Sequence, residues 1–250
     1  MARLSCSPAP RNWPAWTGLA LGLLAAPLAH AQTCQATSQA QAPAVVELYT
    51  SQGCSSCPPA DRWLSTLKGQ SQVIALSFHV NYWNHLGWKD PYATPETTDR
   101  QRRIQAALQG KYVYTPQVVL NGQDHRNWQG QSAAQLPRLA GAQAPKLRVT
   151  RNGDTLVAHV DASAGHATLA GYWAVLHDGL SQQVTRGENA GERLLNDHVV
   201  QLYRTIGPWS ASAPHDATLT LPADAGQRVV FVVTDSSWTQ PLQAVALQCS

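Results

Sequence analysis

The sequence predicts an α/β domain followed by an all-β, sandwich-like domain, both preceded by an export signal. Strand and helix patterns alternate between residues 44 and 139, as they do in α/β proteins. Beyond this point the chain has only short strand patterns separated by Gly, Pro, Asn and Asp, which is typical of sandwiches and barrels. We therefore expect a signal at residues 1–31, an α/β domain at 32–143 and a β domain at 144–250.

The first 31 residues have the features of a secretory signal peptide. Arg3 and Arg11 precede the mostly apolar stretch Trp13–Ala31, which ends in the small-x-small pattern Ala29-His30-Ala31. A membrane anchor is the alternative, but a span needs about 20 apolar residues and prolines interrupt this stretch. We expect cleavage before Gln32, export to the periplasm or the medium, and no stable membrane span afterwards.

The expected α/β domain begins with a lead-in arm at Gln35–Pro43 and two apolar runs that predict buried strands, Ala44–Thr50 and Val73–Val80. Helical spacing of apolar residues predicts a helix over Pro58–Lys68. The other expected elements are a helix at Glu96–Leu108 with Thr94 as a possible N-cap, a strand at Gln117–Leu120 closed by an Asn121-Gly122 turn, and a short helix at Ser132–Leu139.

The expected β domain begins near Gly141–Pro145. Leu147–Thr150 and Leu156–Val160 flank Asn152-Gly153, which predicts a hairpin. Further strands are expected at Thr168–Leu176, Gln183–Arg186, Ala217–Leu221, Val229–Thr234 and Leu242–Leu247.

Charge and motifs exclude several functions. The chain has 18 basic and 15 acidic residues and a net charge of +3, so the basic footprint of a nucleic-acid-binding protein is absent and no nucleic-acid partner is expected. The sequence contains no G-x-S-x-G, H-E-x-x-H, P-loop or dinucleotide-binding pattern, so hydrolase chemistry that depends on a serine or a metal has no support.

Four cysteines remain after the expected cleavage, which removes Cys6. An even number in an exported chain indicates two disulfides. Cys54 and Cys57 form a C-x-x-C pair, which leaves Cys34 and Cys249 near the two ends of the exported chain. Because domain termini often lie close together, we expect a structural Cys34–Cys249 disulfide. The alternative is that one or both are free or bond to another molecule.

Cys54 and Cys57 lie between a predicted strand and a predicted helix. Thiol–disulfide exchange needs one thiolate that attacks and a second thiol that resolves the mixed disulfide. We predict that Cys54 is the exposed nucleophile and Cys57 the shielded resolving thiol. A helix N-terminus can lower a thiol pKa, although Pro58 and Pro59 weaken this effect on Cys54. A structural disulfide and a metal site stay open as alternatives.

The segment Tyr114–Gly122 places Thr115-Pro116 directly before a predicted strand. A proline there suits a cis peptide bond. The alternative is an ordinary proline at the entry of a strand.

The C-x-x-C segment and the Thr-Pro strand together resemble the thioredoxin-like superfamily, in which a cis-proline faces the cysteine pair. More narrowly, three segments resemble an exported bacterial family, domain of unknown function 1223 (DUF1223). These are ELYTSQGCSSCPPAD at Glu47–Asp61, FHVNYWNHLGWKDP at Phe78–Pro91 and RGENAGERL at Arg186–Leu194. The resemblance implies a thioredoxin-like fold for the α/β domain and a redox role, and it supplies no substrate.

Several residues are candidates to support the cysteine pair. Glu47 is a candidate proton relay, as the likeness to thioredoxins suggests, or else a surface carboxylate. Trp83 and Thr115 are candidates for lining the site. His79 and His85 can stabilise a thiolate or bind a soft metal such as Cu(I), or else they are ordinary core or surface histidines.

Three charged groups have simpler interpretations. We expect an exposed helix face for Arg100, Arg102 and Arg103, a solvated ion pair for Lys89 and Asp90, and a structural hydrogen-bond network, packed against the first domain, for Arg186, Glu188 and Asn189.

The sequence therefore predicts an exported thiol–disulfide oxidoreductase that acts on protein or small-molecule dithiols or disulfides. Cys54 attacks, Cys57 resolves, and Pro116 positions the partner. No cofactor is expected beyond the redox-active disulfide. One alternative is a Cu(I) module that uses Cys54, Cys57 and His79 or His85. Another is an interaction protein whose C-x-x-C disulfide is permanently closed.

Overall fold

The computed structural model describes residues 33–139, 144–222 and 228–249. The predicted signal peptide and its cleavage site therefore lie outside the described residues. Within them are fourteen strands, two α-helices and two short 3-10 helices. No helix among these residues has the length and apolarity needed to cross a membrane.

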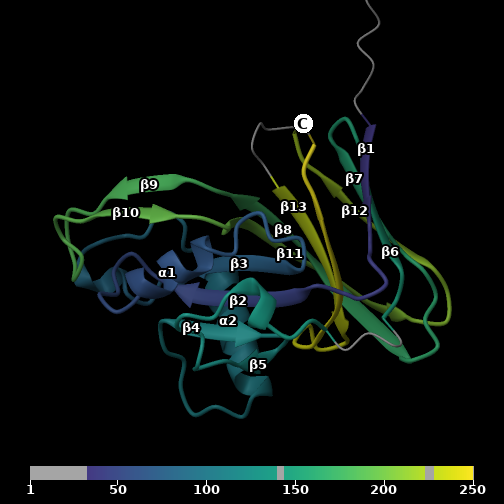
Figure 1. The fold of residues 1–250 in the computed structure, drawn as a ribbon, viewed down its shortest axis with the longest axis horizontal. Coiled ribbons are helices and arrows are strands. Elements are labelled where there is room, and N and C mark those ends of the chain that lie inside the picture. The colour runs from purple at the N-terminus through teal and green to yellow at the C-terminus, as the bar shows by residue number, and fades with distance from the viewer. Residues whose placement is uncertain (1–32, 140–143, 223–227, 250) are drawn as a thin grey trace, which may run out of the picture. The chain divides into compact units, whose positions relative to one another are not determined.

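Strands dominate the described chain (Figure 1). They are β1 (Thr33–Thr37), β2 (Ala44–Thr50), β3 (Val73–His79), β4 (Gln117–Leu120), β5 (Gln123–Asp124), β6 (Leu147–Asn152), β7 (Thr155–Val160), β8 (Thr168–His177), β9 (Leu180–Gln183), β10 (Arg193–Asn196), β11 (Val199–Ser210), β12 (His215–Thr220), β13 (Arg228–Asp235) and β14 (Pro241–Leu247). The helices are α1 (Pro58–Ser65), α2 (Pro95–Ala107), η1 (Asn84–Leu86) and η2 (Ala133–Gln135).

One eight-stranded sheet runs through both halves of the sequence, in the order β14-β13-β8-β11-β3-β2-β4-β5. Strand β2 pairs with β3 in parallel and with β4 in antiparallel orientation. The junction between the halves is the pair β3 and β11, which run parallel and meet at Ser77 and Val199. Strand β11 then pairs with β8 along most of its length.

A second, four-stranded sheet has the order β1-β6-β7-β12, and β9 and β10 form a separate two-stranded ribbon. Apolar residues of the four-stranded sheet pack against one face of the C-terminal part of the large sheet. This core contains Leu147, Val149, Leu156, Ala158, Trp173, Val175, Phe231 and Val245.

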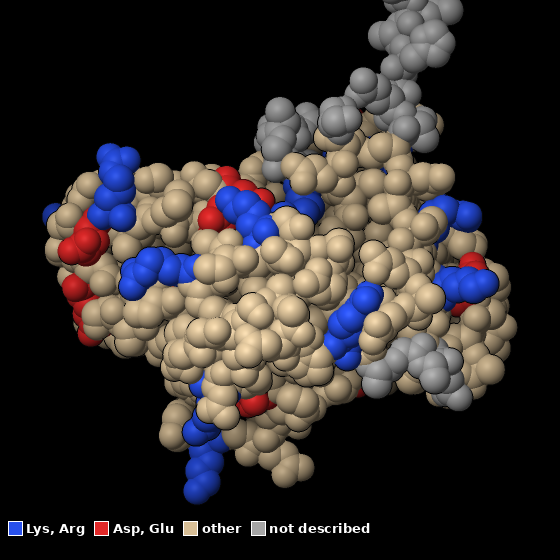
Figure 2. Space-filling model, viewed as in Figure 1, with Lys and Arg blue, Asp and Glu red and all other residues tan. Residues whose placement is uncertain are grey.

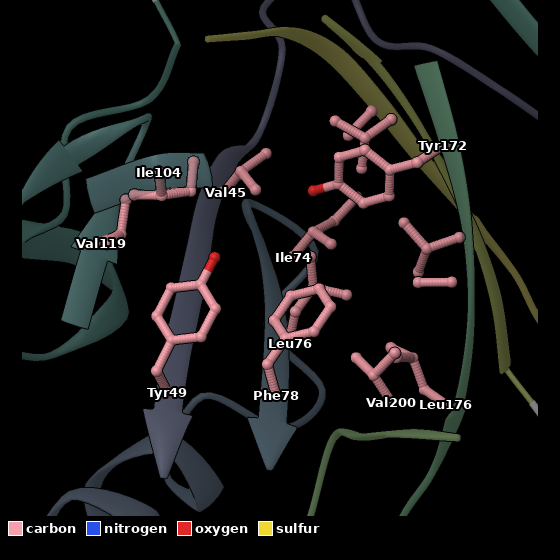
Figure 3. Close-up of a cluster of buried hydrophobic side chains, with 14 of the residues drawn as sticks. Val45, Tyr49, Ile74, Leu76, Phe78, Ile104, Val119, Tyr172, Leu176 and Val200 are labelled. Carbon is pink, nitrogen blue, oxygen red and sulfur yellow. The ribbon is translucent and has the colours of Figure 1, made fainter. Parts of the chain in front are cut away.

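The period-two alternation of strand side chains divides the core around β2 and β3 between two faces. Val45 and Tyr49 of β2 pack with Ile104 of α2, whereas Val46 and Leu48 pack with α1. The α2 face continues onto the C-terminal strands and includes Tyr172, Leu176 and Val200. Figure 3 shows this cluster, with residues from both halves of the chain side by side.

The predicted fold class, an α/β thioredoxin-like domain followed by a separate all-β sandwich-like domain, is wrong. The structure is mostly β, with three sheets and two α-helices among the described residues. Strands on both sides of the expected boundary complete one sheet, and the described residues belong to one compact unit. The boundary near 141–145 itself lies mostly outside the described residues, so the division into two domains stays a prediction.

Most individual elements agree with the sequence interpretation. Strands β2 and β4 have the expected limits, and Thr94 caps α2 by accepting a hydrogen bond from the amide of Thr97. The exceptions are the helix expected at Ser132–Leu139, which is reduced to η2, and the strand expected at Gln183–Arg186, since β9 ends at Gln183. Strands β1, β10 and β11 were not expected.

Candidate functional site

The cysteine pair lies between the end of β2 and the start of α1. Cys54 and Cys57 form a disulfide with a Cα–Cα distance of 5.4 Å. Cys57 is the N-cap of α1 and already has helical backbone angles, and Pro58 and Pro59 follow it in the first turn. The carbonyl oxygen of Cys57 accepts hydrogen bonds from the amides of Ala60 and Asp61. The helix therefore begins where the two prolines predict, and Cys54 lies just outside it.

Both cysteines are buried, with 0% of either residue exposed. The two residues between them, Ser55 and Ser56, are exposed, and the Cys54 Sγ lies 3.4 Å from the Ser56 Oγ. The disulfide thus lies directly beneath a surface turn. The expectation that Cys54 is exposed is wrong for this oxidised form.

A loop from the distant part of the chain covers the cysteine turn. We call residues 186–190 the capping loop. The Asn189 side-chain amide donates to the carbonyl oxygens of Gln52 and Cys54, each at 2.9 Å, and the Glu188 carboxylate accepts from the Ser55 amide at 2.8 Å. This backbone hydrogen bond lowers the pKa of Glu188. The network expected for Glu188 and Asn189 is present and joins the two halves of the sequence.

Gln52 connects the cysteine turn to two other segments, the loop that contains Trp88 and Asp90 and the end of β10. Its amide donates to Asp90 at 2.8 Å, its side-chain amide donates to Asn196 at 2.9 Å, and it accepts from the Trp88 indole at 3.1 Å. Gln52 and Asn196 are almost fully buried. Sequence reasoning missed both, because a lone Gln and a lone Asn carry no pattern that separates a buried hub from a turn residue.

Thr115 and Pro116 directly precede β4. The peptide bond between them is cis. Gln117, the first residue of β4, pairs with Tyr49 near the end of β2. The Trp83 indole donates to the Thr115 hydroxyl at 2.8 Å.

Trp83 also approaches the cysteine turn closely. A Cβ built on Gly53 would lie 3.1 Å from the Cβ of Trp83. A side chain at position 53 would therefore force the turn and Trp83 apart. The structure thus connects two of the predicted site residues to the turn that carries Cys54, Trp83 by this approach to Gly53 and Thr115 through its hydrogen bond with Trp83.

A buried polar cluster lies under the start of α1. His79 Nδ1 lies 2.8 Å from Asp90 Oδ2, and Asp61 Oδ2 accepts from the Thr50 hydroxyl at 3.1 Å. Burial alone would lower the pKa of His79, but the Asp90 carboxylate raises it above its usual value. Burial would raise the pKa of Asp90, but the charge of His79 and the hydrogen bonds to the carboxylate lower it. The expectation that Asp90 is part of a solvated ion pair is wrong.

Asp61 is the carboxylate closest in sequence to the cysteine pair on the helix side, and sequence reasoning did not select it. Burial raises the pKa of Asp61 from 3.8 to about 6, although the charge of His79 and the hydrogen bond from Thr50 act in the opposite direction. A signal was available, because Asp61 follows Cys57 by four residues and both therefore fall on one helix face.

Glu47 lies on the other face of the sheet. Its carboxylate accepts two hydrogen bonds from Arg100, at 2.5 and 3.1 Å, and one each from the hydroxyls of Tyr49 and Tyr172. Glu47 and Arg100 are 3% and 2% exposed. Arg100 was expected on an exposed helix face together with Arg102 and Arg103, and this is wrong for Arg100 and correct for the other two. The Glu47 carboxylate is thus occupied in a network that ties β2, α2 and β8 together.

The histidines of the metal alternative occupy different environments. His79 is fully buried against Asp90, whereas His85 is exposed, with its Nδ1 2.7 Å from the carbonyl oxygen of Tyr82. Within the described ranges, no group of three or more His, Cys, Asp or Glu residues is arranged to hold a metal ion.

Figure 2 shows the charged residues of one face, where uncharged residues separate the lysines and arginines.

The second disulfide links Cys34 of β1 to Cys249, with a Cα–Cα distance of 6.0 Å and a sequence separation of 215 residues. The expected pairing is present. Two disulfides in one chain indicate an oxidising environment outside the cytoplasm.

The chain matches one family model and is similar to solved structures of two other proteins. The family model described as "Protein of unknown function (DUF1223)" matches residues 45–234. Protein AGR_C_4864 from Agrobacterium tumefaciens is similar in structure, with a TM-score of 0.61 and 28% sequence identity over 85% of this chain and 99% of that chain. HBP35 of Porphyromonas gingivalis is similar with a TM-score of 0.51 and 12% identity over 84% of this chain and 76% of that chain, so that the likeness concerns the fold alone.

The search of curated proteins finds no match. None of these comparisons confirms the resemblance to the thioredoxin-like superfamily.

Proposed function

The chain belongs to the DUF1223 family, and we propose that it acts as a thiol–disulfide oxidoreductase through Cys54 and Cys57. The observation that carries the proposal is the closed C-x-x-C disulfide beneath an exposed two-serine turn at the start of α1. A partner sulfur can reach such a pair from the surface once the turn and the capping loop separate.

The short loop that this disulfide closes supports a chemical role over a stabilising one. In the chain-entropy model, a bond between residues three apart stabilises the fold by only about 2 kcal/mol, whereas a bond across 215 residues contributes about 5 kcal/mol. The Cys34–Cys249 disulfide therefore accounts for most of the covalent stabilisation. The Cys54–Cys57 bond contributes too little to stability to be explained as a structural crosslink.

The reaction needs no diffusible cofactor. In the reducing direction, the Cys54 thiolate attacks one sulfur of a partner disulfide and releases the other as a thiolate, which takes up a proton from water. The Cys57 thiol then loses its proton and attacks Cys54, which closes the Cys54–Cys57 disulfide and releases the second partner sulfur as a thiolate, so that two electrons pass from the pair to the partner. Pro116 would hold the partner chain next to Cys54. The partners are dithiols or disulfides of proteins or small molecules in the periplasm or the medium.

A Cys57→Ala variant tests this proposal. With its resolving thiol removed, Cys54 should form a stable mixed disulfide with an added peptide disulfide, detected as a mass increase. The matched control is Cys54→Ala, which keeps one thiol at Cys57 and should form far less adduct. A Cys57→Ala protein that is folded and yet forms no adduct would contradict the proposal.

The complete burial of both cysteines favours a second candidate, an interaction protein whose C-x-x-C disulfide is never opened. This candidate predicts that neither single-cysteine variant forms an adduct while the protein is folded. The same experiment therefore separates the two candidates.

A further inference from the structure

We propose that a cavity between the two halves of the chain binds a small carboxylic acid with an apolar body. The cavity has a volume of about 430 Å³, which lies within the usual range of small-molecule sites, about 300–1,000 Å³. It is lined by the end of β1 and the arm that follows, the loop between α1 and β3, the start of β3, the strands β13 and β14, and His198. None of the lining residues belongs to the turn that carries the cysteine pair, so this site is separate from the proposed oxidoreductase site.

The inner walls of the cavity are apolar. Its buried apolar lining includes Leu67, Val73, Ile74, Val230 and Val245. The exposed side chains of Gln70, Ser71 and Gln248 also line it, and all three are polar and uncharged. An apolar ligand body would leave water for these walls, which is favourable, while the polar side chains keep the opening wet.

Arg228 is the one charged side chain among the described residues that line the cavity. Its guanidinium donates to the two oxygens of Asp178 at 3.2 and 3.5 Å, which is longer than the roughly 2.7–2.9 Å of a strong charge-assisted hydrogen bond. Its Nε–H donates to no group in the described part of the chain. Asp178 itself does not line the cavity. Arg228 can therefore bind a further anion from the cavity side.

His198 supplies a second donor at the same end of the cavity. Its ring is 2.7 Å from Arg228, measured from Nδ1 to Nη2. A guanidinium can only donate, so Nδ1 is the acceptor and the ring proton of the neutral imidazole is on Nε2. This Nε2 is buried and has no partner within the described ranges. Burial and the charge of Arg228 lower the pKa of His198 to about 4, so the ring stays neutral at pH 7.

The backbone of His198 is fixed on both sides. Its amide donates to Asp178 at 2.7 Å, and its carbonyl oxygen accepts from the Ser77 amide at 2.8 Å. The side chain is 3% exposed. The imidazole and the guanidinium are therefore held in place before any ligand arrives, which lowers the entropy lost on binding.

These two residues determine the chemical class of the ligand. The hydrogen-bonding capacity that they leave unused consists of donors, the Nε–H of Arg228 and the Nε2–H of His198. A carboxylate is an acceptor-only group and carries the charge that complements a guanidinium. No acidic side chain is among the described residues that line the cavity, which disfavours a cationic ligand. Because the rest of the lining is uncharged, one carboxylate is expected and not two.

The Cys34–Cys249 disulfide joins two of the segments that line this cavity. Cys34 belongs to β1, whose last residues Ala36 and Thr37 line the cavity, and Cys249 follows β14, whose residues 244–246 also line it. The disulfide therefore keeps these two parts of the wall together.

Calorimetric titration with octanoate tests the proposal, and 1-octanol is the uncharged comparison. The wild type should bind octanoate at one saturable site, about tenfold or more tightly than 1-octanol, because hydrogen bonds to a charged group stabilise the complex. Arg228→Met should weaken octanoate binding at least about tenfold and leave 1-octanol binding nearly unchanged. The matched control is Arg102→Met, which removes an exposed arginine of α2 and should bind both ligands as the wild type does.

A second variant keeps the test decisive if Arg228→Met does not fold. Ala246 is exposed on β14 and lines the cavity, so Ala246→Trp should place an indole ring in the opening and weaken the binding of both ligands. Ala107→Trp, at an exposed position of α2 outside the cavity, is its control. The inference would be overturned by a wild type that does not bind octanoate, by equal affinities for octanoate and 1-octanol, or by undiminished octanoate binding in Ala246→Trp.

Discussion

Glu47 and Asp61 are both buried carboxylates close to the cysteine pair in the sequence, and their environments differ. Glu47 receives four hydrogen bonds, two of them from Arg100, so its charge is fully compensated. Asp61 receives one and keeps an oxygen without a partner in the described part of the chain. A compensated buried charge contributes to structure, whereas an uncompensated one is suited to exchanging a proton.

Replacing Arg100 tests whether the buried charge of Glu47 is stabilised by its ion pair with Arg100. Arg100→Met should lower the free energy of unfolding by about 3–5 kcal/mol, because it leaves the Glu47 charge buried without its partner. Urea denaturation measures this. The control is Arg102→Met on the same helix, whose exposed ion pair with Asp99 should be worth less than about 1 kcal/mol. Equal losses in the two variants would contradict the burial of the Arg100–Glu47 pair.

The pH dependence of stability tests the environment of Asp61. Its pKa is 3.8 in an unfolded chain and about 6 in the folded protein, so between these values the folded state binds more protons at this site. Asp61 therefore makes the protein less stable as the pH rises from 4 to 7, by up to about 3 kcal/mol. Asp61→Asn removes this titration.

The free energy of unfolding of Asp61→Asn, measured relative to the wild type by urea denaturation, should thus increase from pH 4 to pH 7. A difference that stays constant across this range would show that the carboxyl group is not perturbed.

At the scale of elements, the capping loop contacts the turn that holds the disulfide, and we expect it to limit access to this bond. Asn189 holds it with two hydrogen bonds to carbonyl oxygens of the cysteine turn. Asn189→Asp replaces the donor by a second acceptor and should make those contacts repulsive. We expect a thiol reductant to open the Cys54–Cys57 bond about tenfold faster, since the loss is worth about 1–3 kcal/mol.

Mass-resolved thiol labelling measures this rate. Asn152→Asp, at an exposed hairpin turn, is the control for the added charge. If both variants react as slowly as the wild type, the capping loop does not limit access.

Local sequence patterns predicted most helices and strands. They did not predict the fold, because it depends on pairing between strands that are far apart in the sequence. Apolar runs identified β2, β3, β8 and β13, and Thr94 with Pro95 identified the start of α2. Strand β11 was missed because its sequence, VVQLYRTIGPWS, mixes polar and apolar residues and contains Gly-Pro. Strand β11 is the one that pairs with β3. Because the sequence-based prediction did not include β11, the two halves of the chain were predicted to be separate domains.

At the candidate site too, local patterns identified some residues, whereas residues that depend on long-range contacts were missed. The cysteines, Pro116, Thr115 and Trp83 could be selected from local spacing and composition. Gln52, Asp90 and Asn196 could not, because the hydrogen bonds that join Gln52 to the other two span 38 and 144 residues of the chain. Arg100 was assigned to the surface because nothing local marks its pairing with Glu47, which is 53 residues away.

At the scale of the whole molecule, we expect the two disulfides to have different roles. Cys34–Cys249 ties the first described strand to the C-terminal end of the described chain. Replacing both residues by Ser should lower the free energy of unfolding by about 2–5 kcal/mol. Urea denaturation of this variant, compared with a Cys54→Ser/Cys57→Ser variant, should show the larger loss for the former. The reverse order would contradict the assignment of Cys34–Cys249 as the structural bond.

We propose that the Cys54–Cys57 bond is opened and closed during function, and a measurement of its reduction potential is the sharpest test. The protein is equilibrated in redox buffers and alkylated, and the oxidation state of each pair is determined by peptide mass spectrometry. We expect a Cys54–Cys57 potential above about −300 mV, with Cys34–Cys249 still oxidised where the first pair is reduced. A Cys54–Cys57 potential below this value, in the range of inert structural disulfides, would contradict it.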